Sequence, residues 1–216
     1  MKTVSRAGFG GSLVLAGLAG FVDAVGFILS GGLFVSFMSG NSTQAGVEAT
    51  SGQPQVAAIA LCLVGGFVLG VMSGRLLGLF LPSVRMGGRI LGLGVGLIGA
   101  TCLVWVWPQP GFSLAALAAV MGAMNTLFVV DGRARIAITY ATGTLVSVGL
   151  GIADHMAGVR RGGWARPALL WAAITVGALV GALTWAAVGL LALVAAATAL
   201  LLLGVVQMIR EARRRQ

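Results

Sequence analysis

No charged side chain lies between Pro167 and Ile209. As one helix this stretch would be about 65 Å long, roughly twice the thickness of the hydrocarbon core of a bilayer. The chain therefore has to fold back on itself, and Gly189 offers the break between two membrane-spanning helices. A stretch of this kind is typical of a protein that crosses a membrane several times.

The rest of the chain has the same character, because 58% of its 216 residues are hydrophobic and only 9% are charged. The net charge of +9 comes from short basic clusters between apolar segments, which indicates control of membrane topology and argues against binding of nucleic acid. We expect an all-α, polytopic membrane protein that forms one transmembrane domain over residues 1–216, with the lipid bilayer as its partner.

Eight apolar segments follow one another, at residues 8–29, 33–47, 55–81, 90–107, 112–130, 136–152, 167–188 and 190–209. Two of them, 33–47 and 136–152, are short for a membrane span and rich in Ser, Thr, Gly and Asn. Such polar segments are costly in lipid, because their side chains find no water there. The two short segments therefore need a special explanation.

The two short segments correspond in sequence, because residues 37–41 align with 140–144. Residues 20–24 align with 122–126, and Gly66 and Gly70 align with Gly177 and Gly181. Since the matches keep their order, we expect an internal repeat of about residues 8–107 and 112–209. The start of the chain resembles a secretory signal, but the repeat requires this helix, so we expect it to stay uncleaved.

Positive charge decides between two topologies. If all eight segments cross, the basic clusters at Arg85 and Arg133 fall outside the cell, against the positive-inside tendency. If the two short segments are broken or re-entrant, six net crossings remain, the two repeats are inverted, and all basic clusters and both termini are cytoplasmic. We expect the second arrangement; eight full spans in two parallel repeats are the alternative.

Polar side chains around the two breaks form the candidate site. Asp23 is the acidic residue well inside a span, where it could bind a proton or a cationic group. Alternatively it pairs with Arg75, the basic residue inside a span, or caps the end of its helix. The expected substrate or ion site contains Asp23, Ser39, Asn41, Asn125, Thr142 and Thr144.

Glycines accompany these polar residues and are expected to break helices or to let them pack closely. The glycines with these expected roles are Gly31, Gly32, Gly40, Gly143, Gly66 and Gly70. In the alternative interpretation the hydroxyl and amide side chains only fix helix packing, and no ligand binds.

Motifs of an enzyme are missing from the sequence. It contains no GxSxG, HExxH or Walker A motif, and its single histidine, His155, lies near the end of an apolar segment. Cys62 and Cys102 lie in apolar segments without the spacing of metal ligands. We therefore expect no catalytic residue, no metal and no cofactor.

Three motifs resemble those of the YoaK-like family, which are bacterial integral membrane proteins with a domain of unknown function. They are Gly20-x-x-Asp23-Ala24-x-x-Phe27, Gly31-Gly32-x-Phe34-Val35 followed by Ser39-Gly40-Asn41, and Thr139-Tyr140-x-Thr142-Gly143-Thr144-Leu145. The resemblance covers nearly the whole chain. It implies a bacterial inner-membrane location and a distant likeness to half of a major-facilitator-type transporter, and it implies no substrate.

Two residues depart from the pattern of this family. Ser39 stands where Thr is expected before Gly-Asn, and Met124 stands where Gln is expected before Asn125. The first change keeps the hydroxyl, and the second removes an amide from the expected site.

A small secondary transporter or permease for an unknown small solute or ion is the function that we expect, with proton coupling through Asp23 as one form of it. At half the usual size for such carriers, the chain could work as a homodimer. The alternative is a membrane scaffold or accessory subunit that transports nothing.

Overall fold

A computed structural model describes residues 6–107, 110–130, 133–134, 138–159 and 163–214. These residues form eight helices: α1 (Arg6–Ser30), α2 (Met38–Thr50), α3 (Pro54–Phe80), α4 (Met86–Val106), α5 (Pro110–Met124), α6 (Ala141–Met156), α7 (Ala165–Val188) and α8 (Leu191–Arg213). Two-residue strands, β1 (Val129–Val130) and β2 (Arg133–Ala134), form an antiparallel pair. Helices α1, α3, α4, α7 and α8 are long and apolar enough to cross a membrane, which confirms the all-α polytopic class.

Three helix pairs hold the bundle together, and they are α1 with α7, α3 with α5, and α4 with α8. Gly17 lies against Ala173, and Gly181 against Phe21, so α1 and α7 run parallel. Because the contact at Gly181 reaches the backbone of Phe21, a side chain larger than hydrogen there would push the two helices apart.

The other two pairs differ in direction. In α3 and α5, Gly66 lies against Ala115 and Gly74 against Ala123, so these helices are parallel. In α4 and α8 the order reverses, because Gly94 meets Leu201 whereas Gly87, earlier in α4, meets the later Met208. These two helices are antiparallel.

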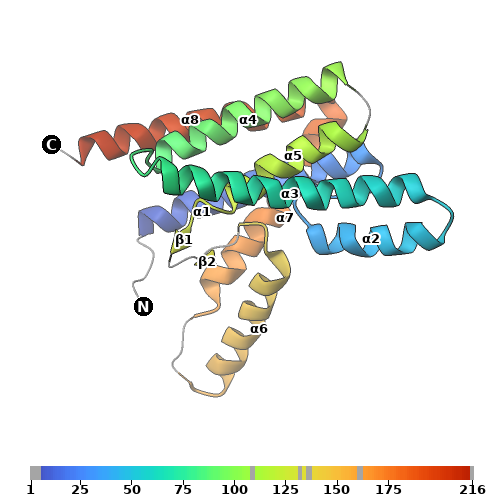
Figure 1. The fold of residues 1–216 in the computed structure, drawn as a ribbon. Helices are drawn as coiled ribbons and strands as arrows, with labels where there is room; N and C mark the ends of the chain where they lie inside the picture. The colour runs from blue at the N-terminus through green and yellow to red at the C-terminus, as the bar shows by residue number, and fades with distance from the viewer. Residues whose placement is uncertain (1–5, 108–109, 131–132, 135–137, 160–162, 215–216) are drawn as a thin grey trace.

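Contacts at one end of the bundle show how the three helix pairs run relative to one another. The first turns of α1 and α4 meet the last turns of α8 there, and Gly8, Met86 and Glu211 line a small cavity between them. Helices α1, α4 and α7 therefore run in one direction, and α3, α5 and α8 run in the other (Figure 1). The short helices α2 and α6 do not change these directions, and the chain path of six crossings with two short returning segments stays a prediction.

Contacts in one half of the chain recur in the other. The pair α1·α7 corresponds to α5·α3, α2·α3 corresponds to α6·α7, and α4·α5 corresponds to α8·α1. This is the pattern that a two-fold axis between α4 and α8 would produce. An inverted arrangement follows, because the corresponding helices α4 and α8 are antiparallel.

The glycine contacts correct the expected alignment of the two halves. Gly70 lies against Ala119 as Gly177 lies against Gly17, which makes Gly70 the counterpart of Gly177. The sequence alignment had paired Gly177 with Gly66, which lies one helical turn before Gly70. Sequence matching could not decide between them, because glycine recurs at every fourth position of α3 from 66 to 78 and a shift by one turn still places glycine on glycine.

The first break lies at Gly31 and Gly32, whose φ angles are 75° and 129°. Gly32 N–H donates to the carbonyl of Phe27 at 2.9 Å and Gly31 N–H to that of Ile28 at 3.3 Å, the hydrogen bonds of a Schellman helix end. Because L side chains rarely adopt such angles, the two glycines allow α1 to stop and the chain to turn back.

Gly40 and Gly143 lie inside the first turns of α2 and α6 and break neither helix. The space beside Gly40 holds the ring of Phe37, and the space beside Gly143 holds the ring of Tyr140. Their missing side chains therefore make room for an aromatic ring at each helix start.

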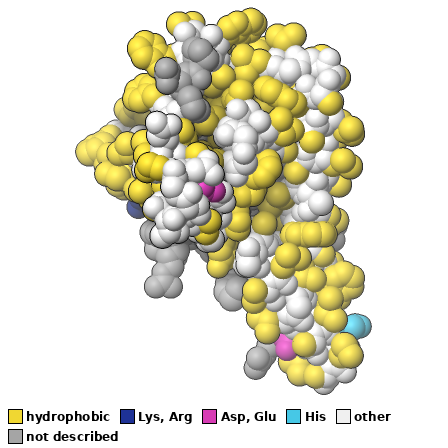
Figure 2. Space-filling model, turned by 90° about the vertical axis from the view of Figure 1, so that its right-hand side faces the viewer, with side chains coloured by type: hydrophobic (Ala, Val, Ile, Leu, Met, Phe, Trp, Pro, Cys, Tyr) yellow, Lys and Arg dark blue, Asp and Glu magenta, His cyan; other side chains and the backbone are white. Residues whose placement is uncertain are grey.

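Apolar side chains cover the outside of the bundle, as Figure 2 shows for one face. Leu69, Val95 and Leu183, from three different helices, are each about three-fifths exposed. In water this surface would favour aggregation, whereas lipid tails cover it in a membrane.

We predict that Gly70→Ala destabilises the protein by about 1–3 kcal/mol, because the new methyl group meets the backbone of Ala119 and forces α3 from α5. Gly65→Ala is the matched control on the same helix, since nothing lies within 4 Å of a methyl group there. Unfolding in mixed micelles, followed by circular dichroism, measures both. Equal stability of the two variants would contradict this packing.

Candidate functional site

A side-chain oxygen of α1 holds the chain beyond the first break. The Asp23 carboxylate accepts hydrogen bonds from the backbone N–H of Val35 at 2.9 Å and of Ser36 at 2.7 Å. Val35 is fully buried and Ser36 nearly so. Asp23 thus provides acceptors for two buried N–H groups that would otherwise lack one, and it acts on the loop after its own helix.

The second half contains the matching hydrogen bond. Asn125 Oδ1 accepts from the backbone N–H of Thr139 at 3.3 Å, and Asn125 Nδ2 donates to Thr139 Oγ1 at 3.1 Å and to the Met121 carbonyl at 3.0 Å. Thr139 precedes Tyr140 as Ser36 precedes Phe37. Both halves therefore tie the polar break to the preceding helix through the aligned Asp or Asn.

Asn41 and Thr144 are occupied by local structure. Asn41 is fully buried; its Oδ1 accepts from Phe34 N–H at 2.9 Å, and its Nδ2 donates to the Phe34 carbonyl at 2.6 Å. Thr144 donates to the carbonyl of Tyr140 at 2.8 Å within its own helix. Neither residue lines the cavity described next, so the structure separates them from the other expected site residues.

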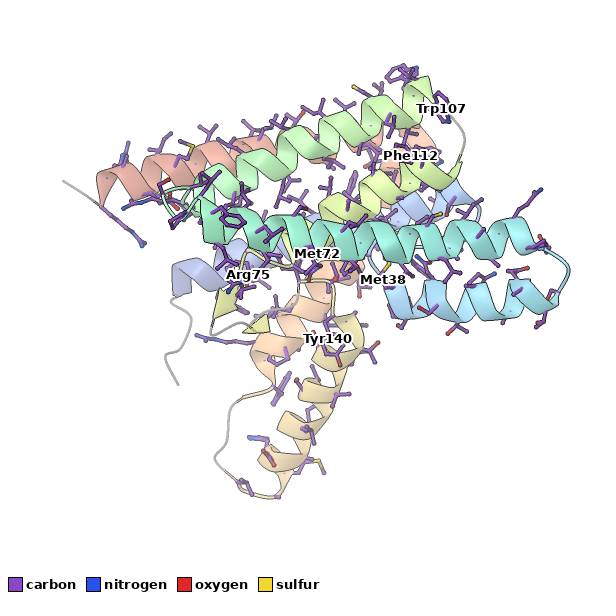
Figure 3. All side chains as sticks on the ribbon, viewed as in Figure 1. Met38, Met72, Arg75, Trp107, Phe112 and Tyr140 are labelled. Carbon is purple, nitrogen blue, oxygen red and sulfur yellow. The ribbon has the colours of Figure 1, made fainter. Side chains whose placement is uncertain are left out.

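A cavity of about 650 Å³ lies between the first break and the equivalent stretch of the second half, residues 138–140 before α6, which we call the second break. It is lined by Ser36, Phe37, Met38 and Ser39 from the first break, Thr139, Tyr140, Ala141 and Thr142 from the second, Asn125, Thr126 and Val129 after α5, and Phe67, Val71 and Arg75 of α3. Figure 3 shows Arg75 on α3, Met38 at the start of α2 and Tyr140 at the start of α6 around this region. Volumes of 300–1,000 Å³ are usual for sites that bind small molecules.

Ser39, Asn125 and Thr142 are brought together in this cavity as expected site residues. Asp23 is not part of the lining and reaches it only through its hydrogen bond to Ser36. Ser36 and Thr139 were missed by the sequence analysis. Their equivalent positions, one residue before Phe37 and Tyr140, are the signal that could have found them.

Arg75 does not pair with Asp23, and the expected ion pair between them is wrong. Helix α1 packs on α7 whereas α3 packs on α5 and α2, so α1 and α3 share no contact. The Asp23 carboxylate is instead turned to the backbone of its own loop. Arg75 is exposed and lines the cavity, and it forms no ion pair with any residue that the structure describes.

Comparison with known proteins shows the family of the chain. A family model described as "Protein of unknown function (DUF1275)" matches residues 11–206, and the chain belongs to this family. It is similar to the "UPF0700 transmembrane protein RA0705" of Rhizobium meliloti (strain 1021), with 36% identity over 165 residues, which cover 76% of this chain and 70% of that protein. No solved structure matches. The expected kinship with membrane proteins of unknown function is confirmed, although neither description uses the YoaK name.

We predict that Asp23→Ala lowers the stability of the protein by about 1–3 kcal/mol, since it leaves the buried N–H groups of Val35 and Ser36 without their acceptor. Asp23→Asn keeps one oxygen and should lose less, because Asn125 makes the matching bond in the second half. Unfolding in mixed micelles measures the difference. Equal losses in both variants would show that these hydrogen bonds do not hold the loop.

Proposed function

We propose that this protein is a small secondary transporter or permease of the bacterial inner membrane, and that its solute binds in the cavity between the two breaks. The proposal rests on the position of this cavity, whose lining comes from both halves of an inverted chain path. Transporters with inverted repeats bind their substrates at the interface of the repeats, where broken helices expose polar groups.

The free hydroxyl groups of the cavity favour transport over a purely structural role. Ser39 and Thr142 are both exposed, and neither hydroxyl forms a hydrogen bond with the residues that the structure describes. In a scaffold, polar side chains inside a bundle would bond to one another, because an unpaired polar group is costly in lipid. Hydroxyls that face open space instead suit a solute or the water that precedes it.

Charge gives the proposed orientation. Arg85, Arg89, Arg210 and Arg213 belong to the end of the bundle where α4 begins and α8 ends. Basic residues accumulate on the cytoplasmic side of membrane proteins, so we propose that this end, where α1 begins and α8 ends, faces the cytoplasm. The turn between α2 and α3 then faces the outside.

This proposal differs from the function expected from the sequence in two points, the homodimer and the proton coupling. The proposed binding site is lined by both halves of one copy of the chain, and the homodimer stays a separate prediction. Asp23 acts by shaping the first break through its hydrogen bonds to Val35 and Ser36, and the proposal contains no proton coupling through it. The chain is also assigned no catalytic role.

A cysteine in the cavity tests transport without knowledge of the solute. We predict that Thr142→Cys, in a background with Cys62→Ala and Cys102→Ala, reacts with a membrane-impermeant thiol reagent added to either side of proteoliposomes of known orientation, because a carrier opens its site to both sides in turn. Ala118→Cys, at a fully buried position of α5, should not react. Reaction of Thr142→Cys from one side only would contradict transport and favour the scaffold.

A further inference from the structure

Arg75 brings to the cavity a positive charge that no residue described by the structure pairs with. It lies on α3, five residues before the end of that helix at Phe80, and lines the cavity together with Val71 and Phe67. These three residues are spaced by four, so they form one stripe on one face of the helix. Arg75 forms the charged end of this stripe, and Phe67 and Val71 form its apolar part.

No negative charge balances Arg75 among the described residues that line this cavity, since none of them is an Asp or a Glu. Asp23, the partner expected for Arg75 from the sequence, instead accepts hydrogen bonds from Val35 and Ser36 and lies outside the lining. A cation in a membrane-spanning segment is costly, and such residues usually mark a ligand or ion path.

The repeat shows that packing does not require this arginine. The correspondence of Gly70 with Gly177 places Ala182 at the position that matches Arg75. The two halves make corresponding helix contacts with a methyl group at one of these positions and a guanidinium at the other. The charge therefore serves something that only one half provides.

The remaining lining describes the other part of the ligand. Aromatic and aliphatic side chains, Phe37, Met38, Phe67, Val71 and Tyr140, form most of the wall, and hydroxyl groups of Ser39 and Thr142 add polar contacts. A guanidinium binds a carboxylate or a phosphate with two parallel hydrogen bonds. The cavity thus suits a ligand with one acidic group and an apolar body.

We propose that the cavity binds a small organic anion, whose acidic group pairs with Arg75 and whose apolar body lies against Phe67 and Val71. This inference rests on the proposed function and names the substrate class of the same site. An acidic lipid headgroup offers the same anionic oxygens. It could also come within reach of Arg75, since the end of α3 is about 7 Å from Arg75 along the helix axis. Competition with benzoate and with phosphatidylglycerol distinguishes the two sources.

Charge selectivity of a cysteine in the cavity tests the proposal. Thr142→Cys, in the background without Cys62 and Cys102, is labelled with two methanethiosulfonate reagents of similar size, one carrying a sulfonate and the other a quaternary ammonium group. We expect Arg75→Gln to lower the ratio of anionic to cationic labelling rates about tenfold. Arg75→Lys should keep most of the ratio, and Arg75→Gln should leave the ratio unchanged at Ser51→Cys in the turn before α3.

Competition then identifies the ligand class. In phosphatidylcholine nanodiscs, benzoate should slow labelling of Thr142→Cys in an Arg75-dependent way, whereas benzamide and benzylamine, which carry zero and one positive charge on the same ring, should not. An unchanged rate ratio in Arg75→Gln, no effect of benzoate, or protection by benzylamine would overturn the proposal. Arg75-dependent protection by added phosphatidylglycerol, without protection by benzoate, would assign the guanidinium to a lipid headgroup and overturn it as well.

These results are distinguishable from a failure of the transport proposal. Labelling from both sides without charge selectivity would leave the transporter standing and remove the anion site. Charge selectivity and benzoate protection with labelling from one side only would establish the anion site in a protein that does not transport.

Discussion

The absence of water in a bilayer is the constraint on which the rest of this structure depends. A chain that stops a helix inside a membrane has to satisfy the freed backbone groups from within the protein. Each half does this with one side chain, Asp23 in the first and Asn125 in the second, which accepts hydrogen bonds from the loop beyond the break. The two polar breaks are thereby held in place, and the cavity forms between them.

Close helix packing supplies the frame for this arrangement. Helices α1 with α7, and α3 with α5, approach so closely that glycine on one helix meets the backbone of the other. Each of these pairs joins one helix from each half, so neither half forms the bundle alone. The cavity consequently has walls from both halves, which is the arrangement expected of an inverted-repeat transporter.

Much of the fold could be predicted from the sequence, because hydropathy, the short polar segments and the positions of basic residues each limit the chain path. The register of the repeat could not, since the glycines of α3 recur every helical turn and match Gly177 equally well at 66 and 70. Of the expected site, Ser39, Asn125 and Thr142 meet at the cavity. Asn41 was misplaced because an amide inside apolar sequence resembles a ligand-binding group, whereas its bonds to Phe34 show a purely local role. The pairing of Arg75 with Asp23 failed because sequence distance and charge do not reveal which helices touch.

The central claim is that α2 and α6 return to the side from which the chain entered them, so that six helices cross. Single cysteines at Ser51, Ser83 and Leu190, in the background without Cys62 and Cys102, test it by labelling with an impermeant reagent in intact and in permeabilised cells. The inverted arrangement predicts that Ser51→Cys and Leu190→Cys react from the same side and Ser83→Cys from the opposite side. Reaction of Ser83→Cys and Leu190→Cys from one side, with Ser51→Cys on the other, would show eight full crossings and contradict the account.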